Sequence, residues 1–285
     1  MKRQIKVAAV QFSPQSYAVE ANLEHAMNLA RKALASGAKI VLLPELFDSG
    51  YCTEDRDKEF GIDLSDPTQP TIAGLKALAG EYKAYLIAGS IEQKQGALFN
   101  SVYIVGERGV VGTYQKVYLW GDEKQRFSRG QGYPVFELPL EGLTLKVGLQ
   151  ICYEVGFSEG SRFLALQGAE LLCFCAAFSK IRSYAWDLGG QARALENGLF
   201  VLAANRCGSE ISKLTHKELT FCGHSKIVNP KGEIVEQLDD QEGVLVGVLD
   251  LDAIKAQRQN IPYLRDLDLE LNQKTLKNIQ CVNLS

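Results

Sequence analysis

The chain has 285 residues, of which 46% are hydrophobic and 23% are charged, and its formal net charge is −3. This composition is sufficient for a substantial core and excludes an intrinsically disordered chain. The slightly negative balance provides no basic surface for nucleic acid, so we expect no nucleic-acid partner.

Signals for export and membrane insertion are weak. The run VAAVQF (7–12) follows basic residues, but it has only six residues and contains Gln11, whereas a signal peptide needs a longer apolar region. No stretch approaches the roughly 20 apolar residues of a membrane helix. We therefore expect a soluble, cytoplasmic protein with no membrane partner.

Buried strands and amphipathic helices alternate in the first third of the chain. KVAAVQF (6–12), KIVLLPE (39–45) and AYLIAGS (84–90) are apolar runs typical of buried strands. Residues 20–36 and 71–82 carry apolar side chains at the i, i+3, i+4 spacing of a helix. This alternation predicts strand–helix–strand units.

Hairpins interrupt the alternation in the middle and in the last third. LFNSVYIVG (98–106) and VVGTYQKV (110–117) flank a glycine turn, and VFELPL and LTLKVGLQIC form a second pair. Further hairpin-like strands follow FCGHS (221–225). Strand–helix–strand order returns between these regions, with helices expected over 159–168 and 185–198. A single sheet would have to hold about a dozen strands, so we expect two packed, mixed sheets with helices over them.

The domain organisation predicted from the sequence is simple. No linker rich in Pro, Gly or Ser divides the chain, so we expect one domain over residues 1–260. A helix over 252–259 precedes a polar tail, 261–285. The tail either contacts a partner subunit or is a loosely held end.

Seven cysteines are scattered along the chain, and their odd number and spacing argue against a disulfide framework. Cys173 and Cys175 are separated by one residue and would face the same side of a strand. They lack further metal-ligating partners at suitable spacing, so we interpret them as small buried hydrophobic residues. We expect neither a metal nor an organic cofactor.

Cys152 is the candidate nucleophile. It ends the apolar strand GLQIC and precedes a helix, so a sharp turn can present its thiol and the helix N-terminus can favour the thiolate. A cysteine of this kind needs a base. Of the three histidines, only His224 in FCGHS is a plausible partner, and a Cys–His thiol hydrolase stays open as an alternative.

Two carboxylates and a lysine are alternative candidates for activating the Cys152 thiol. Glu45 follows a buried strand behind Pro44, where partial desolvation raises the pKa of a carboxyl group toward that of a useful base. Lys116 lies near the end of another strand, and Glu123 follows seven residues later. An ammonium group can stabilise an oxyanion, and a second carboxylate can keep it charged and oriented.

Three motifs occur in a fixed order: PELFDSGY, then YQKVYLW with Glu123 downstream, then GLQICYEVGFSE. Together they resemble the nitrilase superfamily of carbon–nitrogen hydrolases, and the resemblance extends over about residues 4–255. It implies a four-layer α-β-β-α sandwich with two mixed β-sheets, an α/β fold. It also implies a catalytic triad of Glu45, Lys116 and Cys152, with Glu123 beside it, and homodimers or higher homo-oligomers that associate through their helical faces.

The resemblance leaves the substrate open among small amides, nitriles and N-carbamoyl compounds. Members that bind carboxylate-bearing substrates often have an arginine where this chain has Gly156, so we predict an amidase for an uncharged or cationic amide. Tyr51, Tyr153 and Phe178 are the predicted substrate-binding residues, although simple packing explains these aromatics equally well. A nitrilase, an N-carbamoyl amine amidohydrolase and a non-catalytic binding module are the alternatives.

Overall fold

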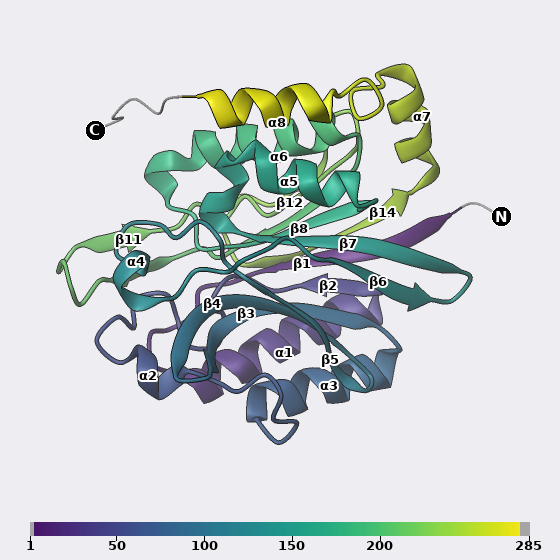
Figure 1. Ribbon diagram of the computed structural model, residues 1–285. Coiled ribbons are helices and arrows are strands. Elements are labelled where there is room, and N and C mark those ends of the chain that lie inside the picture. Colours follow the sequence, from purple (N-terminus) through teal and green to yellow (C-terminus); the bar gives the residue numbers. More distant parts are fainter. Residues whose placement is uncertain (1–2, 280–285) are drawn as a thin grey trace.

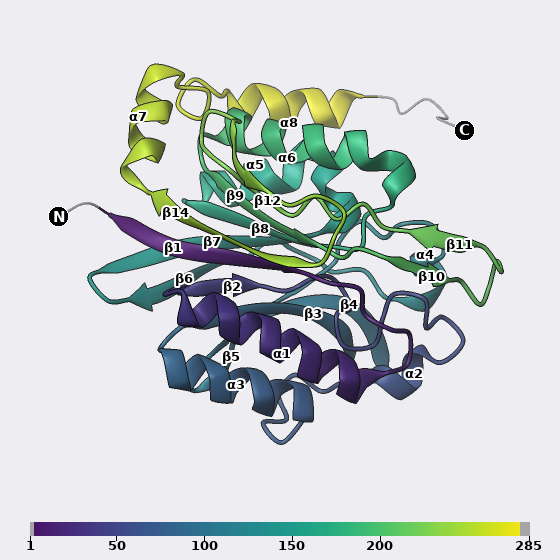
Figure 2. The same cartoon turned by 180° about the vertical axis from the view of Figure 1, so that it is seen from behind.

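The computed structural model describes residues 3–279 and has four layers. Two six-stranded sheets lie face to face, and helices cover the outer side of each sheet (Figures 1 and 2). Both sheets combine parallel and antiparallel neighbours. The predicted α-β-β-α sandwich with two mixed sheets is confirmed.

The first sheet has the order β14-β1-β2-β3-β4-β5. The β1–β2 and β2–β3 pairs are parallel and the others are antiparallel. Helices α1 (Val19–Ala35) and α3 (Pro70–Tyr82) pack on its outer face. The strands are β1 (Gln4–Gln11), β2 (Ile40–Leu42), β3 (Tyr85–Lys94), β4 (Ala97–Gly106), β5 (Gly109–Gln115) and β14 (Gly243–Asp250).

The second sheet has the order β13-β12-β9-β8-β7-β6, with parallel pairs β7–β8 and β8–β9. Helices α5 (Ser158–Leu166) and α6 (Ser183–Asn197) cover its outer face. The strands are β6 (Val135–Leu140), β7 (Leu143–Ile151), β8 (Leu171–Ala176), β9 (Phe200–Asn205), β12 (Lys226–Val228) and β13 (Ile234–Gln237).

The alternation of side chains along β1 explains its unbroken apolar sequence. Val7 and Ala9 point into the core between the sheets, whereas Ala8 and Val10 belong to the core under α1 and α3. A strand buried on both faces needs apolar residues at every position, because successive side chains point to opposite faces. The same reasoning applies to β2.

The remaining elements lie outside the two six-stranded sheets, and α8 lies on the outer side of α5 and α6. Within residues 3–279, no helix combines the length and apolar character needed to cross a bilayer. The elements outside the two large sheets and their main helices are α2 (Asp57–Phe60), α4 (Glu123–Arg126), the 3₁₀ turns η1 (Cys152–Gly156) and η2 (Lys180–Arg182), the hairpin β10 (Ser209–Ile211) and β11 (Glu218–Thr220), α7 (Asp252–Asn260) and α8 (Leu269–Asn278).

Three details differ from the sequence prediction. The hairpin β10–β11 occupies a segment to which the sequence analysis assigned no strand, and α8 forms within the expected polar tail. The part of the tail beyond residue 279 lies outside the described residues. In addition, α5 begins only at Ser158, so Cys152 lies on a five-residue 3₁₀ turn and is separated from the helix N-terminus.

Candidate active site

The three residues of the predicted triad come from the ends of three strands. Glu45 follows β2, Lys116 follows β5 directly, and Cys152 follows β7. β2 and β5 belong to the first sheet and β7 to the second, so the site forms where the ends of the two sheets meet. The sandwich thus joins residues that are far apart in the sequence.

The loop that carries Glu45 packs tightly against β3 at Gly89. A Cβ atom at Gly89 would lie 3.1 Å from Glu45 Cα and 3.3 Å from the carbonyl oxygen of Pro44. Contacts this short with main-chain atoms leave little room for a side chain. A glycine at this position therefore lets the Glu45 loop lie directly on the sheet.

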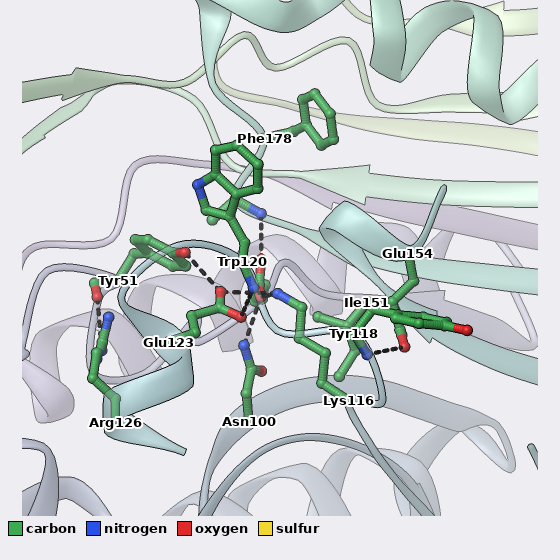
Figure 3. Close-up of polar contacts among 12 residues, drawn as sticks. Tyr51, Asn100, Lys116, Tyr118, Trp120, Glu123, Arg126, Ile151, Glu154 and Phe178 are labelled. Carbon is green, nitrogen blue, oxygen red and sulfur yellow. Dashed lines mark hydrogen bonds and ion pairs between the residues drawn. The ribbon is translucent and has the colours of Figure 1, made fainter. Parts of the chain in front are cut away.

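Lys116 links the two carboxylates of the site (Figure 3). Its Nζ lies 2.8 Å from Glu45 Oε1 and 2.9 Å from Glu123 Oε1, and none of the three side chains is exposed. Burial by itself lowers the pKa of the lysine, but the Glu123 and Glu45 carboxylates raise it by a larger amount. The net result is a pKa above the usual range for lysine. Lys116 is therefore a permanent, fixed cation.

Glu45 accepts two further hydrogen bonds. The side-chain amide of Asn100 donates to Oε1 at 2.7 Å, and the Ala177 N–H donates to Oε2 at 2.8 Å. These donors fix the orientation of the carboxylate. Sequence analysis did not identify Asn100, although a polar residue within the apolar strand LFNSVYIV was a detectable signal.

Glu123 accepts two further hydrogen bonds, from Tyr51 and Trp120. The Tyr51 hydroxyl donates to Glu123 Oε1 at 2.7 Å, and the Trp120 N–H donates to Oε2 at 3.0 Å. Arg126 supports the loop at Tyr51, because its Nη2 donates to the carbonyl oxygen of Tyr51 at 3.1 Å while its guanidinium pairs with Asp57. Tyr51 therefore has a structural role besides its place in the pocket.

Cys152 has a left-handed backbone conformation, with φ of +49°. A non-glycine residue in this region is strained and is often functional. Burial raises the pKa of its thiol well above the usual range, the Glu45 carboxylate raises it further, and Lys116 acts in the opposite direction. The resting residue is therefore a neutral thiol that needs a base during attack.

Glu154 connects the cysteine turn to the lysine strand. Its carboxylate accepts from the N–H groups of Ile151, Val117 and Tyr118 and from the Tyr114 hydroxyl, at 2.7–3.1 Å. Burial raises its pKa to about 7. Through these four hydrogen bonds, the Glu154 side chain fixes the positions of the two segments on which Cys152 and Lys116 lie.

A cavity of about 190 Å³ opens beside Cys152. The three aromatic residues that we predicted to bind the substrate, Tyr51, Tyr153 and Phe178, line this cavity. Gly156 lies on its wall as well. The other lining residues, which sequence analysis did not assign to the pocket, are Trp120, Val155, Ala177, Ser179, Arg182, Ala185, Leu219 and Phe221.

The histidines lie elsewhere. His224 Nδ1 lies 3.1 Å from Asp187 Oδ2 on α6, and His25 Nε2 lies 2.8 Å from Glu242 Oε2. Neither lines the cavity at Cys152, so the geometry does not favour the Cys–His alternative. Within residues 3–279, no group of three or more His, Cys, Asp or Glu side chains is arranged to hold a metal ion.

Comparison with known proteins finds the same architecture. The family model described as carbon-nitrogen hydrolase matches residues 6–259. A nitrilase of Pyrococcus abyssi is 36% identical over 92% of this chain and 95% of its own length. An N-carbamoylputrescine amidase of Arabidopsis thaliana is 34% identical over 93% of both chains. The crystal structure of a carbon-nitrogen hydrolase from Helicobacter pylori superposes with a TM-score of 0.87 and 27% identity, covering 98% of this chain and all of that one.

Proposed function

The chain belongs to the carbon–nitrogen hydrolase family, and we propose that it is an amidase that converts a small amide to a carboxylic acid and ammonia. Hydrolysis of a non-peptide carbon–nitrogen bond is its class of reaction. The observation that carries the proposal is the buried Glu45–Lys116–Glu123 array beside Cys152.

Acylation begins with proton transfer from the Cys152 thiol to Glu45. The sulfur attacks the amide carbon, and the carbonyl oxygen becomes an oxyanion that Lys116 and the Tyr153 N–H stabilise. As the tetrahedral intermediate collapses, the carbon–nitrogen bond breaks and Glu45 returns its proton to the departing ammonia. The product of this half-reaction is a thioester on Cys152.

Deacylation repeats the steps with water. Glu45 takes a proton from a water molecule, the resulting hydroxide attacks the thioester carbon, and the same donors stabilise the second oxyanion. The carbon–sulfur bond breaks, the carboxylic acid leaves, and Cys152 regains its proton from Glu45. The hydrogen bonds from Asn100 and Ala177 to Glu45 support this double use, because they hold its carboxylate in one orientation.

The near alternatives use the same residues. A nitrilase would add a thiolate to a nitrile, and an N-carbamoyl amine amidohydrolase would cleave a carbamoyl group. The relatives include proteins named for each of these activities. A non-catalytic binding module is disfavoured, because Glu45, Lys116, Glu123 and Cys152 are all present in the sequence.

Homo-oligomer formation is part of the proposal. The outer helical layer exposes large apolar side chains, among them Phe163 on α5 and Tyr184 and Leu188 on α6. Figures 1 and 2 place α8 on the outer side of this layer, and Leu271 and Leu276 on α8 are exposed as well. Apolar exposure of this kind is typical of a surface that a partner covers, so we propose that the segment from residue 261 onward contacts a second subunit.

We also propose a cytoplasmic location. The six cysteines among the described residues are free and buried, which fits a reducing compartment.

The test is ammonia release from a panel of amides, nitriles and N-carbamoyl amines, with Cys152→Ala and Cys207→Ala compared with wild type. Cys207 is another buried free cysteine and does not line the cavity. We expect release from amides that only Cys152→Ala abolishes, together with an acyl adduct on Cys152 detected by mass spectrometry. Release confined to nitriles or carbamoyl compounds would contradict the amidase assignment.

A further inference from the structure

Arg182 is a solvent-exposed cation on the wall of the catalytic cavity. It ends the 3₁₀ turn η2, between β8 and α6, and it lines the same cavity as Cys152. Among the described residues on the cavity wall, it is the only one with a formal charge; the others are aromatic, aliphatic, small or hydroxyl-bearing. A lone cation on an otherwise apolar wall is a candidate for recognition of a charged part of the substrate.

Two contacts orient the exposed guanidinium relative to the catalytic residues. Its central carbon lies 4.8 Å from the centroid of the Trp120 ring, and Nη1 donates to Ser179 Oγ at 3.0 Å. The Trp120 N–H in turn donates to Glu123, which binds Lys116. The cation therefore stands at a defined place over the pocket, and stacking on the ring leaves its edge available to a ligand.

Arg182 has no anionic partner within residues 3–279. Nearby cations on the same side are paired: Lys180 lies 2.9 Å from Asp240, and Lys226 pairs with Asp187. Within the described residues, the guanidinium of Arg182 donates one hydrogen bond, to Ser179 Oγ, so most of its five N–H donors stay free. A planar guanidinium with free donors on one edge binds a carboxylate through two parallel hydrogen bonds.

The buried charged groups near Cys152 do not line the cavity, but they act on the cysteine thiol and therefore on a substrate bound to it. Glu45 and Glu123 carry two negative charges against the single positive charge of Lys116. Their excess negative charge disfavours an anionic substrate unless a cation on the cavity wall compensates for it. Arg182 provides that compensation.

We propose that Arg182 binds the carboxylate of the substrate, and that the substrate is an amide with a carboxylate at its far end, such as the monoamide of a short dicarboxylic acid. This inference rests on the proposed amidase function and names its substrate class. The cavity of about 190 Å³ holds only a short linker between the two groups. The missing arginine at Gly156 favoured an uncharged or cationic substrate, but here a different segment of the chain supplies the cation.

The experiment compares two matched amides of similar length, succinamic acid and pentanamide, in wild type, Arg182→Ala, Arg182→Lys and Arg182→Glu. We expect wild type to prefer the anionic amide at least tenfold in kcat/KM. Arg182→Ala should reduce kcat/KM for succinamic acid by 10- to 100-fold, mainly through KM, and change that for pentanamide less than threefold. Arg182→Lys should retain part of the preference, and Arg182→Glu should reverse it.

Lys180→Ala is the matched control, because Lys180 is an exposed cation two residues away that does not line the cavity. It should leave both substrates unchanged. Equal losses for both amides in Arg182→Ala, or a wild type without preference for the anionic amide, would overturn the inference while leaving an amidase in place. Failure of wild type to release ammonia from any amide would instead contradict the proposed function, and the inference with it.

Discussion

Lys116 and Glu45 form an ion pair of 2.8 Å in which neither side chain has any solvent exposure. The two residues are 71 positions apart and follow strands β5 and β2 of the same sheet. Removing two charges from water is costly, and their attraction offsets this cost only when the geometry is good and the remaining hydrogen bonds are made. Asn100 and Ala177 make those bonds to Glu45, and Glu123 completes the surroundings of the lysine.

Replacement of Glu45 by Gln should remove the base and leave the fold intact. We expect kcat to fall by about 10²–10⁴-fold, the range associated with loss of a general base, because glutamine cannot accept the thiol proton. Glu92→Gln is the control, since Glu92 is another buried glutamate with two side-chain donors, Ser101 and Gln115. Steady-state ammonia release is the measurement, and an active Glu45→Gln enzyme would rule out this role.

Replacement of Lys116 by Met should abolish activity and lower stability. The change leaves Glu45 and Glu123 buried without a cation, which costs on the order of 3–5 kcal/mol. A second change, Glu123→Gln, removes one of the two charges, so the double variant should recover part of the lost stability and none of the activity. Chemical denaturation and ammonia release measure the two effects separately.

Lys226→Met is the matched control for this prediction. Lys226 is also a fully buried lysine, and it pairs with Asp187 outside the cavity. We expect it to reduce stability while turnover stays within a few-fold of wild type. If Lys116→Met retained turnover, or if the double variant were no more stable than the single one, the electrostatic account of the site would be wrong.

The residues that follow buried strands were predictable from the sequence, because apolar runs mark the strands and their ends mark the edge of a sheet. Glu45, Lys116 and Cys152 were found in this way, and the motifs they lie in supported the choice. Asn100 and Arg182 were not. Asn100 is a polar residue in an apolar strand, but the strand sequence does not reveal which carboxylate it contacts, and the turn that carries Arg182 shows no distinct pattern. Their roles depend on which strands and turns become neighbours, and the sheet order determines that.

Periodicity in the sequence likewise predicts some elements of the fold and misses others. Long strands with both faces buried and an amphipathic helix such as α1 follow directly from periodicity. The hairpin β10–β11 has only three residues in each strand, with mostly exposed side chains. Helix α8 has no buried residue within this chain. The hairpin is too short to show a periodic pattern, and the leucines of α8 lie in a mostly polar segment.

The exposed face of α6 leads to a prediction about assembly. We expect wild type to have the mass of at least two chains in light scattering, and Leu188→Glu to shift it toward one chain. Leu188 is 66% exposed, and burial of such a side chain in an interface contributes about 1.5–3 kcal/mol. Val248→Glu is the control, because Val248 is an exposed apolar residue on β14 in the other sheet. A wild type that stays monomeric at micromolar concentration would contradict the proposed interface.

Stability should depend on pH through Glu154. Its pKa rises from 4.5 to about 7 on burial in the folded protein, so between these values the folded chain holds a proton that the unfolded chain has released. The contribution of Glu154 to the free energy of unfolding therefore decreases as the pH rises from about 4.5 to about 7, by about 3 kcal/mol in total, and is constant above that range. Glu154→Gln lacks this titration, so the difference in stability between wild type and variant should shift in favour of the variant by that amount across the window. Urea denaturation of both proteins at pH 5, 6, 7 and 8 measures the difference, and a pH-independent difference would show that Glu154 is ionised throughout.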